Sequence, residues 1–220
     1  MTTRYYFSWF NEGLPERLIK ALQRDISDRK SLVMINGQPT KFDYPDISLV
    51  KDRWLTPASI VFDKYHMIDY RKTKSEAHQL LQEASVIFLC GGVTMDLHEF
   101  IVAYDLSDVI NKTSGVILGA SAGAINMSRQ WLCSKQTGSL VERSSVCEGL
   151  GLDDFFFCSK ANLTLDDNEL IDELLPLSQR FDSYLAINEG AIRIKKGQMG
   201  IFGEVHRLSQ GQLKQMPETF

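Results

Sequence analysis

Short apolar runs alternate with amphipathic segments over most of the chain. Apolar runs of this length are typical of strands buried on both faces of a parallel sheet, and they predict strands at 5–10, 31–36, 59–69, 84–92 and 115–121. Apolar residues recur at helical spacing between them and predict helices at 13–26, 73–84, 94–110 and 122–132. A polar connection containing Pro45 and Pro57 separates the second and third strands. This alternation predicts an α/β fold: a doubly wound, mostly parallel sheet with helices on both faces.

The pattern changes after about residue 150. One more helix is expected at 166–177, with Asp166 or Asp167 as its cap, and a strand at 183–188. The segments 191–203 and 204–216 alternate around Lys-Gly and Gln-Gly pairs, which predicts two C-terminal β-hairpins. Because neither a repeat nor a linker interrupts the sequence, we expect a single domain over residues 1–220.

Composition narrows the classes of partner. Hydrophobic residues make up 44% and charged residues 24%, as in ordinary globular proteins, and the net charge of −4 gives no reason to expect nucleic acid or an anionic membrane. The N-terminus lacks the apolar core of a signal peptide, so a cytoplasmic location is expected. The four cysteines are scattered without metal-ligand spacing, which predicts reduced thiols and no metal.

The chemistry of the chain centres on the stretch SGVILGASAGAINMS, residues 114–128. Gly119, Ser121 and Gly123 form a GxSxG pattern between a predicted strand and a predicted helix, the setting of a nucleophile elbow. Ala120 and Ala122 complete a surround of small residues. Such a turn exposes the serine hydroxyl and aims the N–H of the next residue, Ala122, at the same point. The alternative is a turn that uses small residues only for close packing.

A second feature follows the preceding strand. It ends at Gly91 and Gly92, where a backbone without side chains can turn another N–H toward an oxyanion. Adjacent parallel strands present their following loops at one sheet edge, where doubly wound folds bind ligands. A plain turn at the strand end is the alternative for this glycine pair.

The segments VIFLCGGVTMDL, GVILGASAGAINMS, EGLGL and AINEGAI occur in the order and spacing of a known family. The chain resembles the peptidase E and cyanophycinase family of serine peptidases, which has the class I glutamine amidotransferase-like fold. The resemblance implies that Ser121 is the nucleophile, that Gly92 and Ala122 donate to the oxyanion, and that Glu189 lies near the site. It also implies cleavage of small peptides, possibly at aspartate, without a cofactor. A plain turn is the alternative for Glu189.

Two departures from the family pattern affect the site. Val93 replaces the asparagine of the family's GGNT segment. The catalytic histidine that normally follows GLGL is absent, and Cys158, Ser159 or Lys160 occupies its place. A serine hydroxyl needs a base, and of these three only Lys160 can serve as one if burial depresses its pKa; a solvated loop lysine is the alternative.

The four histidines do not obviously replace the missing base. His78 and His98 are expected to be surface or structural residues of helices. His66 in the third predicted strand and His206 between the terminal hairpins could reach the site only through details of the fold.

Two functions therefore compete. The first is a serine-type peptidase acting on a small peptide or another small amide. The second is a catalytically impaired relative that binds a small ligand or partner. A cysteine-dependent amidotransferase is disfavoured because the elbow residue is serine. Both functions are compatible with a homodimer.

Overall fold

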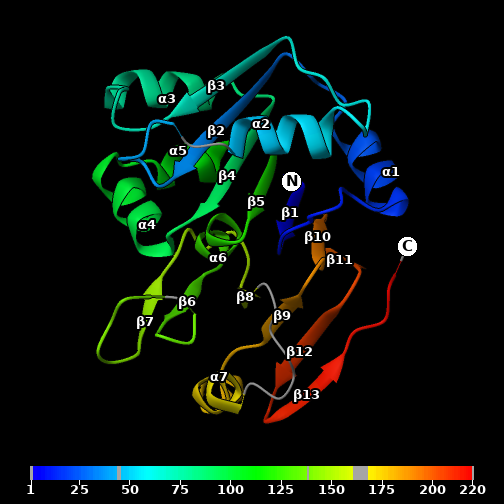
Figure 1. Ribbon diagram of the computed structural model, residues 1–220, viewed down its shortest axis with the longest axis vertical. Coiled ribbons are helices and arrows are strands. Elements are labelled where there is room, and N and C mark those ends of the chain that lie inside the picture. Colours follow the sequence, from blue (N-terminus) through cyan, green and yellow to red (C-terminus); the bar gives the residue numbers. More distant parts are fainter. Residues whose placement is uncertain (1, 44–45, 138, 161–167, 220) are drawn as a thin grey trace.

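A seven-stranded sheet forms the centre of the molecule, in the order β11-β10-β1-β5-β4-β2-β3 (Figure 1). The computed structural model describes residues 2–43, 46–137, 139–160 and 168–219. The strands of this sheet are β1 (Arg4–Phe7), β2 (Ser31–Gly37), β3 (Lys64–Ile68), β4 (Val86–Gly92), β5 (Val116–Ala120), β10 (Ala191–Lys195) and β11 (Gln198–Phe202). The five strands from β1 to β3 are parallel, and β10 joins β1 antiparallel. The predicted mostly parallel sheet is confirmed.

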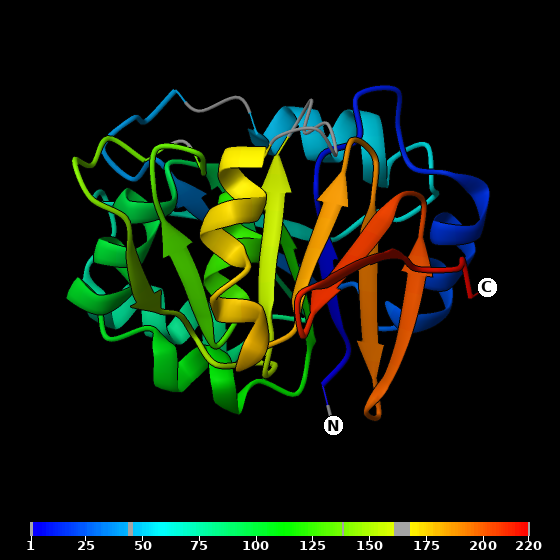
Figure 2. The same ribbon diagram turned by 90° about the horizontal axis from the view of Figure 1, so that it is seen from below.

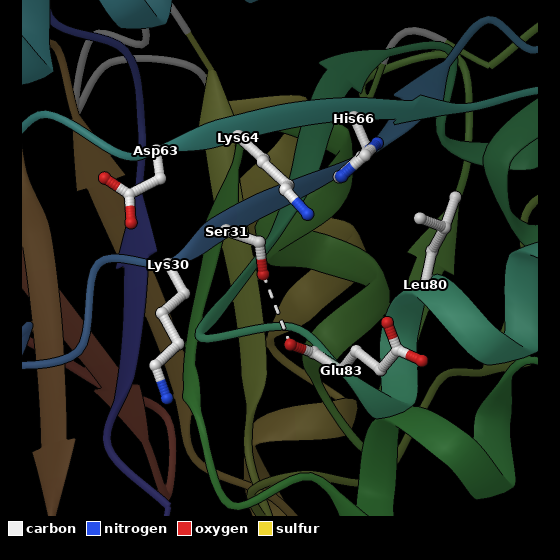
Figure 3. Close-up of a pocket in the computed structure, with 7 residues that line it drawn as sticks. All are labelled: Lys30, Ser31, Asp63, Lys64, His66, Leu80 and Glu83. Atoms are coloured by element: carbon white, nitrogen blue, oxygen red, sulfur yellow. Dashed lines mark hydrogen bonds between the residues drawn. The ribbon is translucent and has the colours of Figure 1, made fainter.

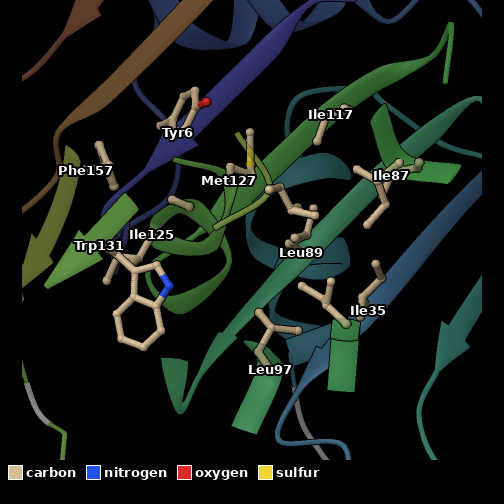
Figure 4. Packing of buried hydrophobic residues seen from close by; sticks show 14 of the residues in the cluster. Tyr6, Ile35, Ile87, Leu89, Leu97, Ile117, Ile125, Met127, Trp131 and Phe157 are labelled. Atoms are coloured by element: carbon tan, nitrogen blue, oxygen red, sulfur yellow. The ribbon is translucent and has the colours of Figure 1, made fainter. Parts of the chain in front are cut away.

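Helices cover both faces of this sheet, as the alternation of strands and helices predicted. One face carries α1 (Glu16–Asp25), α2 (Asp46–Leu49) and the π-helical turn η1 (Val50–Leu55). The other carries α3 (Lys74–Gln82), α4 (Thr94–Ala103), α5 (Ser107–Lys112) and α6 (Ala122–Met127). Successive strand residues point to opposite faces, so Tyr5 and Phe7 pack toward α1 while Tyr6 packs with Met127 of α6 (Figure 4).

A smaller sheet lies beside α6, in the order β13-β12-β9-β8 (Figure 2). Its strands are β8 (Phe156–Lys160), β9 (Ser183–Ile187), β12 (Val205–Ser209) and β13 (Gln212–Gln215), and α7 (Asn168–Leu174) and the short helix η2 (Leu177–Gln179) cover it. An antiparallel ribbon of β6 (Gln130–Cys133) and β7 (Ser145–Glu148) follows α6. The predicted hairpin turns are present, and Lys196–Gly197 and Gln210–Gly211 all have positive φ.

One local prediction, the start of the helix at residue 73, holds in detail. The helix predicted from residue 73 begins with a complete capping box, in which the Thr73 hydroxyl accepts from the Glu76 N–H at 3.2 Å. The Glu76 carboxylate in turn accepts from the Thr73 N–H at 2.7 Å. The predicted caps Asp166 and Asp167 lie outside the described residues.

Three predicted elements are shorter than expected. The strand predicted at 5–10 ends at Phe7, and the N–H of the next residue, Ser8, bonds to Gly190 O. The strand predicted at 59–69 begins only at Lys64. The helix predicted at 94–110 is two helices, since Asp105 adopts a left-handed φ of 55° and ends the first one.

One further prediction fails for a tertiary reason. The helix predicted at 122–132 ends at Met127, and Gln130–Cys133 forms β6 instead, paired with β7. The connection between β2 and β3, which the sequence showed only as a polar segment, contains α2 and η1. Trp54 of η1 is buried, and its indole N–H donates to Phe10 O at 2.9 Å.

Two buried clusters hold β1 in place from opposite faces. The Tyr5 hydroxyl donates to Asp25 at 2.7 Å, and Arg193 and Lys195 bond to the same carboxylate at 2.6 and 2.7 Å. Burial alone would raise the pKa of Asp25, but the hydrogen bonds from Arg193, Lys195 and Tyr5 lower it overall. On the other face the Tyr6 hydroxyl donates to Asp153, which also pairs with Arg4.

Candidate active site

Ser121 occupies a strained turn between β5 and α6. Its backbone has φ 48° and ψ −114°, a conformation that costs free energy for any residue with a Cβ. The Ser121 N–H donates to Phe7 O at 3.0 Å, and Ser121 O accepts from the Ile125 N–H at 2.9 Å. The side chain is half-buried and does not cap α6. No hydrogen bond to its hydroxyl forms within the part of the chain whose side chains are described.

The small residues around Ser121 are required by close contacts. A Cβ on Gly123 would lie 2.0 Å from Leu89 O, and one on Gly119 would lie 2.4 Å from the sulfur of Met127. Ala120 and Ala122 are almost completely buried. α6 therefore packs directly on β4 and β5, and larger residues in the turn would push it away.

The Gly91–Gly92 pair ends β4 and lies beside this turn; from here on, the Gly92 loop means the chain from Gly91 to the start of α4. β4 and β5 are adjacent and parallel, with Leu89 opposite Gly119, so Gly91 and Ser121 each stand two residues farther along neighbouring strands. Gly92 has φ 140°, and a Cβ there would lie 2.7 Å from Gly37 O. The sequence-based expectation that both loops emerge at one sheet edge agrees with this arrangement.

Val93 follows as the N-cap of α4. Its N–H donates to Gly37 O at 3.2 Å, but its side chain makes no capping hydrogen bond and is 38% exposed. Valine is a poor N-cap residue. The position thus presents an apolar side chain to solvent next to the glycine loop.

Asn126 joins the two loops, and the sequence analysis did not single it out. Its side-chain amide donates to Thr94 O and to Ala122 O, both at 3.0 Å. The residue is 1% exposed. The signal in the sequence is one polar amide within the otherwise small and apolar helix AGAINM, although its second partner on α4 could not be foreseen.

Glu189 lies in the turn between β9 and β10, next to the end of β1. Its carboxylate accepts from the N–H groups of Asn11 at 3.0 Å and Glu12 at 3.4 Å, so it organises the loop after β1. The Ser8 hydroxyl bonds to the carbonyls of Asn188 and Gly190 on either side of Glu189. Because β1 lies between β5 and β10, this turn and Ser121 lie at the same end of the strands, where β1 and β5 finish.

The EGLGL segment leads from β7 to β8 and bonds to the end of α6. The N–H groups of residues 149–152 donate to the carbonyls of residues 126–129, with Leu150 N bonded to Asn126 O at 2.8 Å. β8 then runs parallel to β9, and Lys160 pairs with Ile187, two residues before Glu189. Lys160 therefore ends its strand near the Glu189 turn; its side chain lies outside the described residues. Ser159 is half-buried, and Cys158 is packed against α7.

Three of the four histidines make their contacts away from the Ser121 hydroxyl. His78 Nε2 bonds to Tyr104 O at 2.8 Å, and the ring of His98 packs edge-on against Trp131 at 5.8 Å. His206 is 4% exposed in β12, and its Nδ1 has no partner among the described residues. None of these three bonds to Ser121 in the described part of the chain.

His66 belongs to a cavity at the other end of the strands. This cavity, of about 470 Å³, lies where β2 and β3 begin and α3 ends (Figure 3). Its lining residues are Lys30, Ser31, Asp63, Lys64, His66, Leu80 and Glu83. β3 is separated from β5 by β2 and β4, so His66 does not reach Ser121.

The described residues contain neither a metal cluster nor a membrane helix. No three His, Cys, Asp or Glu side chains among them are arranged to hold a metal ion. All four cysteines are free thiols, three of them buried. No described helix has the length and apolarity needed to cross a bilayer.

Comparison with models of known protein families shows which family this chain belongs to. The model of peptidase family S51 matches residues 54–202, which is more than half of the chain and includes both glycine-rich loops. The chain belongs to peptidase family S51. The resemblance to peptidase E seen in the motifs is thereby confirmed, and the protein is assigned to a family of peptidase hydrolases.

Solved structures support the same fold for this S51 chain. A peptidase from an acI-B1 actinobacterium is similar with a TM-score of 0.71 and 17% identity, covering 99% of this chain and 95% of its own. A candidate peptidase E protein from Listeria monocytogenes EGD-e has a TM-score of 0.64 and 16% identity, covering 92% and 98%. At these identities the likeness shows the fold alone. A comparison with curated proteins finds no match.

Proposed function

We propose that this S51 chain is a serine-type peptidase for small peptides, with Ser121 as the nucleophile. The observation that carries the proposal is the backbone of Ser121, at φ 48° and ψ −114°, between a buried strand and a helix. A serine held in such a turn against its conformational preference is the arrangement of a nucleophile elbow.

The reaction needs three contributions from the chain. Ser121 Oγ attacks the carbonyl carbon of the substrate while its proton passes to a base, and the C–N bond then breaks as the amine takes up a proton. The N–H groups of Gly92 and Ala122 are proposed to hold the oxyanion, with Gly91 allowing the close approach of the loop. Water then hydrolyses the acyl-enzyme.

Lys160 is the proposed proton acceptor. It ends β8 at the strand position paired with Ile187, and no histidine bonds to Ser121 in the described part of the chain. Glu189 is proposed to shape this edge through the loop after β1. Following the family resemblance, we propose peptides with an aspartate before the cleaved bond as the first substrates to test.

A second function competes because the Ser121 hydroxyl has no described base. The chain would then bind a small ligand or partner without turning it over. Loss of a triad member leaves only ~10³- to 10⁴-fold acceleration over water, too little for a metabolic peptidase.

Labelling with a fluorophosphonate, followed by intact mass, tests Ser121 without knowledge of the substrate. We expect one adduct on the wild type and none on Ser121→Ala. Lys160→Met should slow labelling by ~10²-fold or more, because the base is lost. Lys64→Met, a change of the same kind at an exposed residue of β3, is the matched control and should label normally.

The outcomes separate the two functions. Adduct formation on a residue other than Ser121 would refute the assignment of the nucleophile. No adduct on the wild type, under conditions that label a control hydrolase, would favour the binding function. Normal labelling of Lys160→Met would refute Lys160 as the base and leave Ser121 in place.

A further inference from the structure

Asn126 occupies a buried position between the two loops that surround Ser121. It lies in α6, four residues after Ala122, and is 1% exposed. Its Nδ2 donates to Ala122 O, four residues earlier in the same helix, and to Thr94 O at the start of α4. One hydrogen of the amide therefore binds the first residue of α4, and the other binds the first residue of α6.

The amide oxygen of Asn126, unlike the amide nitrogen, makes no hydrogen bond to a described residue. Both hydrogens of Nδ2 have acceptors, whereas Oδ1 is buried and has no partner among the described residues. An unpaired buried polar atom lowers stability, and an apolar side chain at this position would avoid that cost. The two donated bonds are thus the property that distinguishes asparagine from leucine here.

One acceptor, Ala122 O, belongs to a proposed oxyanion donor. The other, Thr94 O, belongs to the residue two positions after Gly92, the second proposed donor. The main-chain carbonyl of Asn126 also accepts from Leu150 N–H, which fixes the end of α6. We propose that Asn126 is a positioning residue, which fixes the Gly92 loop relative to the first turn of α6 so that the two N–H groups converge. This inference rests on the proposed serine peptidase function.

Convergence of the donors matters because oxyanion stabilisation depends on geometry. A shift of about 1 Å in a positioned group can reduce the rate by ~10²-fold. α4 and α6 are separate helices, and Asn126 supplies a hydrogen bond from one to the backbone of the other beside the site. Removing the amide would let the two loops move independently.

Asn111 provides a matched control. Its Nδ2 also donates to the carbonyl four residues earlier, Ser107 O at 3.0 Å, and to a second segment, Leu150 O at 3.1 Å. The same pair of donated bonds thus occurs at an exposed residue of α5, which is connected to Asn126 only through the backbone of Leu150. Asn126→Leu keeps the number of side-chain heavy atoms and removes the donors, and Asn111→Leu makes the same change at the control site. Asn126→Ala serves if the leucine does not fold.

The first measurement is the rate of fluorophosphonate labelling, with circular dichroism to confirm folding. We expect Asn126→Leu to label at least tenfold more slowly than the wild type, and Asn111→Leu to label at the wild-type rate. A folded Asn126 variant that labels at the wild-type rate, or an equal slowing in both variants, would overturn the proposal.

The second measurement is hydrogen exchange of the peptides that cover residues 92–97 and 119–127. We expect Asn126→Leu to raise exchange in both peptides, at amides such as Leu97 N–H and Ile125 N–H, and Asn111→Leu to raise it in neither. Hydrogen exchange can be measured whether or not Ser121 is reactive. If the wild type does not label, the peptidase function fails, while raised exchange in both peptides still supports Asn126 as the link. Unchanged exchange would overturn it.

Discussion

Replacing Ser121 by glycine is expected to stabilise the protein while removing the proposed nucleophile. Ser121 carries a Cβ at φ 48° and ψ −114°, which only glycine adopts without strain. The backbone hydrogen bonds at this position, from Ser121 N–H to Phe7 O and from Ile125 N–H to Ser121 O, do not involve the side chain and are retained. Ser121→Ala, which keeps the Cβ, is the reference variant.

The size of the effect follows from two opposing terms. A residue held in a sparsely populated backbone region costs about 1–3 kcal/mol. Glycine gains freedom in the unfolded chain, which lowers the free energy of unfolding by roughly 0.5–1 kcal/mol. Because the side chain is only half-buried, little packing is lost. Ser121→Gly should therefore be more stable than Ser121→Ala by about 1 kcal/mol.

Thermal and urea unfolding of the two variants measure this difference. For a chain of this size, about 1 kcal/mol corresponds to a difference in Tm of roughly 2–4 °C. Neither variant should react with the fluorophosphonate. A glycine variant less stable than the alanine variant would refute the reasoning, since it would show that the turn stores no strain.

Two further changes test the surroundings of the site. Gly123→Ala should lower the free energy of unfolding by about 3 kcal/mol or abolish folding, because its Cβ would lie 2.0 Å from Leu89 O; a variant of wild-type stability in urea would contradict this packing. Asp25→Asn should cost about 3 kcal/mol, since it leaves Arg193 and Lys195 without their carboxylate. Because the folded state lowers the pKa of Asp25, wild-type stability from this group is present above about pH 4 and is lost as the pH falls through the folded pKa. The Asn variant should lack that component of the acid loss in urea titrations at several pH values; an unchanged acid profile would refute it.

Much of the fold was predictable because the main sheet is built from short, doubly buried strands. Residues 32–35 and 86–90 are continuously apolar, and β4 lies between β2 and β5, which are apolar strands as well. The order of strands and helices then favours a parallel sheet. The turn at Ser121 was predictable because its small residues are consecutive in the sequence, although one of them, Gly123, is required by a contact with Leu89 of β4.

The errors occur where distant segments decide the local structure. Gln130–Cys133 has apolar residues that suit a helix or a strand, and its pairing with β7 selects the strand. Leu97 and Phe100 fit the predicted long helix, but the chain turns at Asp105 to place Leu106 in the core. The role of Asn126 depends on a carbonyl of α4 that no local pattern reveals.

The separation of the molecule into two sheets has a consequence for evolution. Ser121 follows a strand of the large sheet, whereas residues 158–160, where the family places its histidine, end a strand of the small sheet. The atoms that a Cβ on Gly119 or Gly123 would meet first belong to α6 and to Leu89 of β4. A substitution at the end of β8 leaves these close contacts in place, so the proposed proton acceptor and the turn that carries the proposed nucleophile can change separately in evolution.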